Sequence, residues 1–178
     1  MRFSMTAQAA TLDSAEKKEL LTPTDLERKG VVAIAEELRH MLADVFVLYL
    51  KTKNFHWHMS GRHFRDYHLL LDEHADQIFA ISDDIAERSR KIGETTLHSL
   101  SESLKYARLK ENNEKFVEPK EMLAELQRDN LQLVKYMRKA HEVCEKNDDV
   151  ATTSLIENWI DQAERRAWFL FEASRGED

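Results

Sequence analysis

Residues 56–74 read HWHMSGRHFRDYHLLLDEH and hold five of the chain's eight histidines, interleaved with aspartate and glutamate. Apolar residues recur at helical spacing on both sides of the Met-Ser-Gly segment, which predicts a turn between two amphipathic helices. The imidazoles and carboxylates of this stretch are then either metal ligands or the polar face of a helix. Which of the two applies depends on the rest of the chain.

The composition of the chain favours long helices. Among 178 residues there are only four glycines and two prolines, and 33% of the residues are charged. Few turn-forming residues and many charges are typical of amphipathic helices, so we expect an all-α fold in one domain. The net charge of −7 should attract cations and repel nucleic acid.

Cysteine usage and hydropathy indicate the compartment. Cys144 is the only cysteine, so no disulfide can form within the chain. No apolar run suits a signal peptide or a membrane span. We therefore expect a cytoplasmic protein that does not contact a membrane.

The apolar pattern predicts a flexible N-terminal arm, residues 1–23, followed by a domain over residues 24–178. Thr24 and Glu27 have the spacing of a capping box at a helix entry. The first long helix should then run to about Trp57. Its apolar residues alternate in steps of four and three, which places them on one face.

Three more long helices follow. The second spans about 62–92, with Gly93 as its stop signal, and the third begins at Pro119, a residue suited to a first helical turn. The fourth covers about 150–173. The segment SLSESLKYA, residues 99–107, predicts a short extra helix in the long connection between the second and third helices. Because antiparallel neighbours need only short loops, these two helices should run parallel, as in a ferritin-like four-helix bundle.

The second helix carries a polar face beside its apolar stripe. At about 100° per residue with His68 as zero, the stripe lies between about −140° and −60°. Asp72, Asp83 and Glu87 lie at about 40°, 60° and 100°. These residues offer the nitrogen and oxygen ligands that divalent iron accepts.

Distance determines how such a site could be built. The pair His68 and Asp72 lies fifteen residues from the pair Asp83 and Glu87, or roughly 22 Å along a helix, so one ion cannot touch both pairs. Suppose that two copies of this helix pack antiparallel across a two-fold axis near residues 77 and 78. The pair His68 and Asp72 of one copy then faces the pair Asp83 and Glu87 of the other. The dimer would then hold two identical sites.

Other interpretations of these residues remain open. A charged helix face is usually solvated, and Glu87 with Lys91 forms an ordinary pair four residues apart. His56 extends the apolar stripe of the first helix, so it is either a buried structural residue or a ligand. Trp57 is most simply a packing residue. The simplest interpretation of the other histidines in the stretch is that they are exposed polar residues: His58, His63 and His74.

Three segments together resemble a known family signature. NFHWHMSG (54–61), YHLLLDE (67–73) and DDIAERSRKIG (83–93) are similar to the motifs of the Dps family, the miniferritins named as DNA-binding proteins from starved cells. The resemblance covers about residues 30–173. It implies a di-iron ferroxidase centre shared by two subunits. One subunit would supply His56, His68 and Asp72 and the other Asp83 and Glu87, with Trp57 beside the iron.

The resemblance also implies an activity and an assembly. A protein of this family would oxidise Fe(II) to Fe(III), preferably with hydrogen peroxide, and store ferric mineral in a hollow dodecamer, protecting the cell from oxidative damage. Zinc would be a competitor for the site. Candidates for an acidic pore lining are Asp148, Asp149 and Glu157.

DNA binding is where the chain departs from the family pattern. Residues 1–30 contain five positive and five negative charges, and the C-terminal SRGED is acidic, so neither end offers clustered phosphate contacts. We predict weak or absent DNA binding, even if the protein is associated with the nucleoid. The alternatives are a DNA-compacting architectural protein with little ferroxidase activity, a plain helical scaffold, and a full-size ferritin, for which Glu37 and His40 have the ligand spacing.

Overall fold

The computed structural model describes residues 20–175, and within them every regular element is a helix. The order along the chain is α2 (Arg28–His58), α3 (Phe64–Lys91), α4 (Leu100–Tyr106), α5 (Pro119–Lys146) and α6 (Val150–Ser174). The predicted all-α fold is confirmed, and so is the short helix in the long connection. None of these helices is long and apolar enough to cross a membrane.

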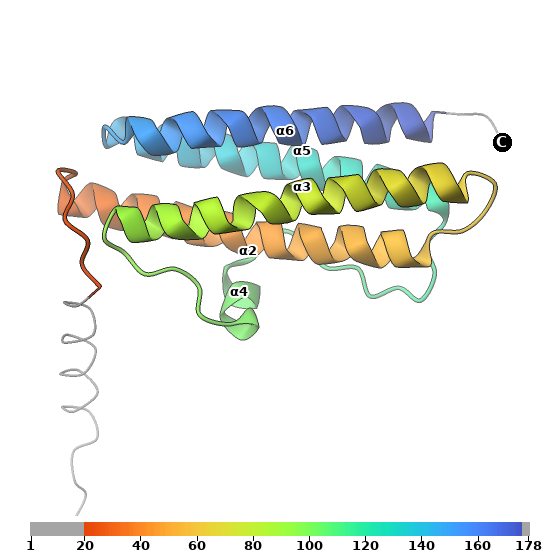
Figure 1. Ribbon diagram of the computed structural model, residues 1–178, viewed down its shortest axis with the longest axis horizontal. Helices are drawn as coiled ribbons and strands as arrows, with labels where there is room; N and C mark the ends of the chain where they lie inside the picture. The colour runs from red at the N-terminus through yellow and green to blue at the C-terminus, as the bar shows by residue number, and fades with distance from the viewer. Residues whose placement is uncertain (1–19, 176–178) are drawn as a thin grey trace, which may run out of the picture.

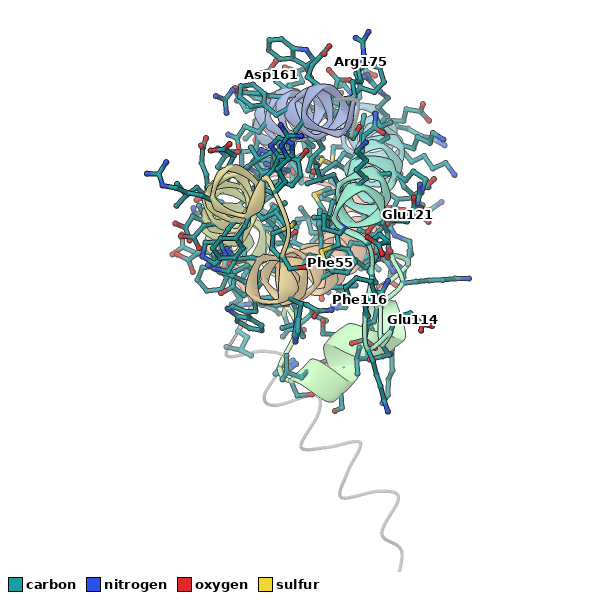
Figure 2. The ribbon with its side chains drawn as sticks, turned by 90° about the vertical axis from the view of Figure 1, so that its right-hand side faces the viewer. Phe55, Glu114, Phe116, Glu121, Asp161 and Arg175 are labelled. Atoms are coloured by element: carbon teal, nitrogen blue, oxygen red, sulfur yellow. The ribbon has the colours of Figure 1, made fainter. Side chains whose placement is uncertain are left out.

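Four of the helices form a bundle, and α4 lies outside it against α2 (Figure 1). The helix pairs α2–α3 and α5–α6 are each joined by a short turn and run antiparallel, whereas α3 and α5 run in the same direction, as the long connection predicted (Figure 1). Viewed end-on, the four helices surround one core, and Glu121 and Arg175 project outward from it (Figure 2). The fold is therefore the ferritin-like bundle expected from the sequence.

Apolar residues at helical spacing form this core. On α5 and α6 these residues are all buried: Met122, Leu126, Leu133, Met137, Cys144, Ile156, Trp159, Ala163, Ala167 and Leu170. The connection after α4 is fixed to α2 by Asp44, a fully buried residue. Its carboxylate accepts hydrogen bonds from the backbone N–H groups of Arg108 and Leu109, at 2.6 and 2.9 Å, and pairs with the Arg108 guanidinium at 2.8 Å.

Gly93 ends α3 in the manner predicted. Its φ is +88°, a conformation that favours glycine, and the N–H groups of Gly93 and Glu94 bond back to the carbonyls of Arg90 and Ser89. The close approach of Thr22 to Gly93 and a 2.7 Å hydrogen bond from Arg90 to the Leu20 carbonyl hold the start of the described chain against this turn. The rest of the predicted arm, residues 1–19, lies outside the described residues.

The predicted capping box at Thr24 is wrong. The helix begins at Arg28 with Glu27 as its N-cap, and no side chain caps it. Thr24 Oγ1 instead accepts a hydrogen bond from the N–H of Leu26, at 3.3 Å. Threonine can bond to the backbone two residues further on as well as to a helix end, and here the local turn is preferred.

Candidate metal centre

The short turn between α2 and α3 brings His56 beside His68. The two imidazole rings stack with their centroids 3.7 Å apart. His56 Nδ1 donates to the carbonyl of His68 at 2.8 Å, and His68 Nδ1 donates to the carbonyl of His56 at 2.9 Å. Because a carbonyl can only accept, each Nδ1 carries the proton and each Nε2 keeps a lone pair. A backbone bond that fixes one ring nitrogen and frees the other is the usual arrangement of a metal-ligating histidine.

Asp72 lies one turn after His68 and faces the same region. Its Oδ1 is 3.7 Å from His56 Nε2 and accepts a hydrogen bond of 2.5 Å from the Lys53 ammonium. That hydrogen bond is the main cause that lowers the pKa of Asp72 and raises the pKa of Lys53. Lys53 was missed by the sequence reasoning, although its position three residues before His56 places it on the same side of α2.

The structure does not bring Asp83 and Glu87 to these three residues. Both are exposed on α3, eleven and fifteen residues beyond Asp72, or roughly 16 and 22 Å along the helix. Glu87 pairs with Lys91 at 3.1 Å, and both of these side chains are more than half exposed. In residues 20–175 of one chain, no three candidate side chains are arranged to hold a metal. One chain alone thus provides separated halves of the predicted site.

Exposed apolar side chains lie on the polar face of α3. With His68 as zero, Phe79 and Leu69 lie at about 20° and 100° on the helical wheel. They are about half exposed, at 52% and 48%. Phe79 packs against Tyr49 with ring centroids 5.0 Å apart but keeps the rest of its surface free. Large apolar residues gathered on one face are typical of an interaction surface. This face is the one on which the sequence predicts a second copy.

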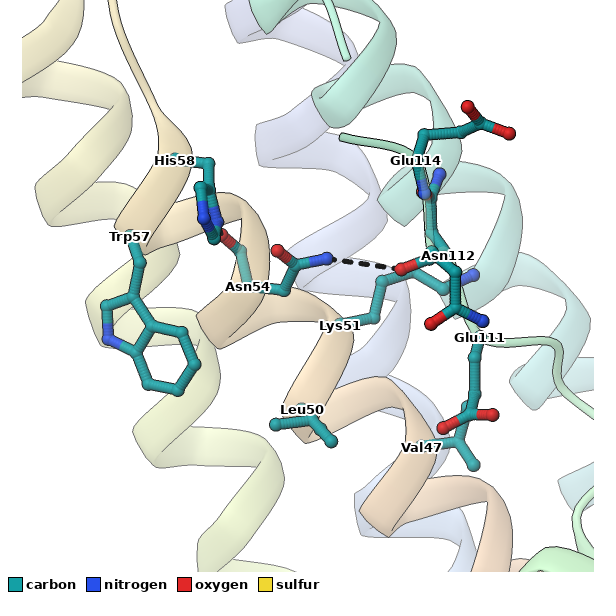
Figure 3. A pocket seen from close by; sticks show the side chains of 10 residues that line it. Val47, Leu50, Lys51, Asn54, Trp57, His58, Glu111, Asn112 and Glu114 are labelled. Carbon is teal, nitrogen blue, oxygen red and sulfur yellow. Dashed lines mark hydrogen bonds between the residues drawn. The ribbon is translucent and has the colours of Figure 1, made fainter. Parts of the chain in front are cut away.

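Trp57 does not pack inside the chain, so that interpretation is wrong. Its side chain is 61% exposed and borders a cavity of about 360 Å³ between α2 and the segment 111–114 (Figure 3). Across the cavity, Asn54 Nδ2 donates to the carbonyl of Asn112 at 3.3 Å. None of the five predicted metal ligands lines this cavity. The indole is next to His56 in sequence and open to solvent or to a partner.

The remaining histidines of the stretch divide into two kinds. His58 and His63 are exposed, as predicted. His74 is 1% exposed, so the prediction for it is wrong. Burial, with the nearby charges of Arg166 and Arg165, lowers its pKa to about 3, and neither ring nitrogen has a hydrogen-bond partner among the described residues. At about −120° on the helical wheel it lies within the apolar stripe, which explains its burial.

Two further groups of candidates have structural partners. Asp149 is 2% exposed, pairs with Arg88 at 2.6 Å and caps α6 by accepting from Thr152 N, so it cannot line a pore. Asp148 and Glu157 are exposed, and Glu157 pairs with His141 at 3.0 Å. Glu37 pairs with Arg108, in the segment after α4, at 3.5 Å, and His40 Nδ1 bonds to the carbonyl of Tyr106, the last residue of α4, at 2.6 Å.

Comparison with known proteins agrees with this fold and motif. Residues 35–173 match the family model described as the ferritin-like domain. The DNA protection during starvation protein of Helicobacter pylori is 30% identical over 135 residues, which are 76% of this chain and 94% of the relative. The chain belongs to the Dps family of ferritin-like proteins.

Solved structures of Dps proteins have the same fold. The Dps of Thermosynechococcus elongatus superposes with a TM-score of 0.78 at 27% identity, covering 82% of this chain and 92% of that one. The Dps of Vibrio cholerae, described as a member of a broad superfamily of ferritin-like diiron-carboxylate proteins, gives a TM-score of 0.80 at 25% identity, covering 85% and 96%. The resemblance drawn from the residue 54–93 motifs is confirmed.

Proposed function

We propose that this Dps protein is a cytoplasmic ferroxidase. It oxidises Fe(II), preferably with hydrogen peroxide, at di-iron centres that bridge two subunits. His56, His68 and Asp72 of one subunit form one half of each centre, and Asp83 and Glu87 of the two-fold-related subunit form the other half. The ferric product is stored as mineral inside a hollow dodecamer, and zinc competes with iron for the centre.

The observation that carries the proposal is the reciprocal bonding of the two histidines. Each Nδ1 is fixed by a carbonyl, at 2.8 and 2.9 Å, which leaves both Nε2 atoms with a free lone pair, and the Nε2 of His56 lies 3.7 Å from Asp72 Oδ1. Neutral imidazole and carboxylate together suit ferrous iron. The half-exposed Phe79 and Leu69 on the same helix favour covering of this face by a second copy.

The chemistry follows from that ligand set. Two ferrous ions bound side by side each give up one electron, and peroxide accepts both as its O–O bond breaks. With two protons the peroxide becomes two waters, and hydroxyl radical is not released. Trp57, the exposed sequence neighbour of His56, would intercept an oxidising equivalent that escapes. The net charge of −7 favours delivery of cations to the centre.

We propose that protection of DNA, the function in the name of the Helicobacter relative, comes here from removing iron and peroxide. The ends of this chain carry no cluster of positive charge for phosphate binding. A DNA-compacting role with little ferroxidase activity is the alternative, and DNA binding without iron oxidation would favour it.

Mutation of the distant carboxylates tests the bridged centre. Replacing Asp83 and Glu87 together with alanine should abolish rapid Fe(II) oxidation by peroxide while helical circular dichroism is retained. The matched control replaces Glu73 and Asp84, two exposed carboxylates of α3 outside the polar face, and should oxidise iron as the natural protein does. Unchanged kinetics in the first variant would rule out Asp83 and Glu87 as ligands.

A further inference from the structure

Arg166 is a positively charged side chain in the core of the bundle. It lies on α6 at 0% exposure, and its Nε donates to Asn130 Oδ1, on α5, at 2.9 Å. Burial lowers the pKa of the guanidinium to about 10, so the group is still charged at neutral pH. A guanidinium has five N–H donors, and four remain on Nη1 and Nη2. Within residues 20–175 neither of these two atoms has a hydrogen-bond partner.

The other buried charges of the described chain are balanced. Lys51 is 5% exposed, and its ammonium contacts Glu125 at 2.9 Å and Asp129 at 2.8 Å. The buried carboxylates each pair with a different arginine: Asp44 with Arg108, Asp149 with Arg88, and Glu94 with Arg28. Arg166 is therefore a buried cation for which the described part of the chain supplies no counter-charge.

His74, on the neighbouring helix α3, adds further unpaired polar atoms. Helix α6 packs against α3 as well as α5. Besides burial, the charge of Arg166 lowers the pKa of His74, so the two side chains lie near enough to interact. The neutral imidazole has one N–H donor, and neither ring nitrogen is bonded to another described residue. Two fully buried side chains thus leave donors free in the same part of the core.

Charge decides what kind of partner suits these donors. A buried charge without a counter-charge costs far more than a neutral polar group without a partner. A trapped water molecule would satisfy N–H donors but would leave the guanidinium charge unbalanced. A monovalent anion does both. It must also be small, because protein interiors are closely packed.

We propose that Arg166 and His74 form a binding site for one chloride ion per chain, between α6 and α3. Arg166 supplies the charge and its Nη donors, and His74 supplies an imidazole N–H. Asn130 positions the guanidinium through Nε and is itself fixed by a 2.8 Å hydrogen bond from its Nδ2 to the Leu126 carbonyl. Only the folded chain brings these groups together, so bound chloride stabilises the bundle. The site is independent of the proposed metal centre.

Thermal unfolding of the full-length protein tests the chloride dependence. Chloride is replaced by gluconate, which is too large for the core, at constant ionic strength. A roughly hundredfold increase in chloride concentration should raise the Tm of the natural protein by about 5 °C. Arg166→Met keeps the bulk and removes the charge, so its Tm should not change with chloride. The matched control is Arg165→Met, at the neighbouring arginine that is 48% exposed, and it should keep the full shift.

Crystals of the natural protein grown with bromide in place of chloride locate the ion. We expect an anomalous difference peak within hydrogen-bonding distance of the Arg166 Nη atoms and the His74 ring in every chain. A site without this peak would hold water or nothing and would overturn the proposal. A peak without chloride-dependent stability would mean an adventitious ion only. A Tm shift that persists in Arg166→Met would be a general effect of the salt and would also overturn it.

Discussion

Replacing His74 with leucine should make the bundle more resistant to acid. His74 lies in the core at 1% exposure, and neither ring nitrogen has a hydrogen-bond partner among the described residues. Burial is the main cause that lowers its pKa from 6.5 to about 3. The folded protein therefore keeps this imidazole neutral at pH values where the unfolded chain protonates it.

The direction of the effect follows from proton binding. Between about pH 6.5 and pH 3 the unfolded state binds the proton and the folded state does not, so acid favours unfolding in that window. Each pH unit within it corresponds to about 1.4 kcal/mol. From pH 7 to pH 5, His74 alone should lower the free energy of unfolding by about 2 kcal/mol. In the folded protein His74 is still neutral at pH 5. The predicted loss in the free energy of unfolding therefore depends mainly on the pKa of this histidine in the unfolded chain.

The assay is urea unfolding followed by helical circular dichroism at pH 7 and pH 5, at one fixed protein concentration. The natural protein should lose about 2 kcal/mol more than His74→Leu between the two pH values. His98→Leu, which removes a histidine that is 69% exposed, is the control and should lose as much as the natural protein. If His74→Leu and the natural protein lose equal stability, His74 is not held neutral in the core and the reasoning fails.

Three other outcomes can be measured. Asp149→Asn should lower the free energy of unfolding by about 3 kcal/mol, because it leaves the charge of Arg88 without its buried partner. Thermal unfolding measures this loss, and a loss below about 0.5 kcal/mol would show that the pair does not stabilise the fold. Gly93→Ala should cost about 1–2 kcal/mol in the same assay, because φ is +88° and the new methyl would meet the Thr22 carbonyl at 2.6 Å; an unchanged transition would contradict this turn geometry. DNA should show no mobility shift at physiological salt, and a persistent shift would restore the architectural alternative.

Much of the fold was predictable because long helices leave a strong periodic signal. The apolar stripes on α5 and α6 are buried, and Gly93 ends α3, because burial and backbone sterics act on the residues that the pattern identifies. The entry of α2 was not predictable, since Thr24 has two local hydrogen-bonding choices that the spacing alone does not distinguish. His74 could have been found: its angle on the helix already placed it with the core residues.

The candidate site was predictable in part. Spacing placed His68 and Asp72 on one face, and the family resemblance added His56. The stacked rings show that His56 lies beside His68. The pairing of Lys53 with Asp72 is a contact between two helices, and no periodicity within one helix reports it. Asp83 and Glu87 can reach His56, His68 and Asp72 only from a second copy of the chain. That part of the site therefore remains a prediction.

The most direct test of the central claim is anaerobic loading of the purified protein with Fe(II), followed by a pulse of hydrogen peroxide and then oxygen. Absorbance is followed in time, and the oligomer mass is measured on the same sample. We predict rapid oxidation by peroxide in a dodecameric particle. Oxidation no faster than in buffer alone would mean that residues 56–74 do not form a ferroxidase centre.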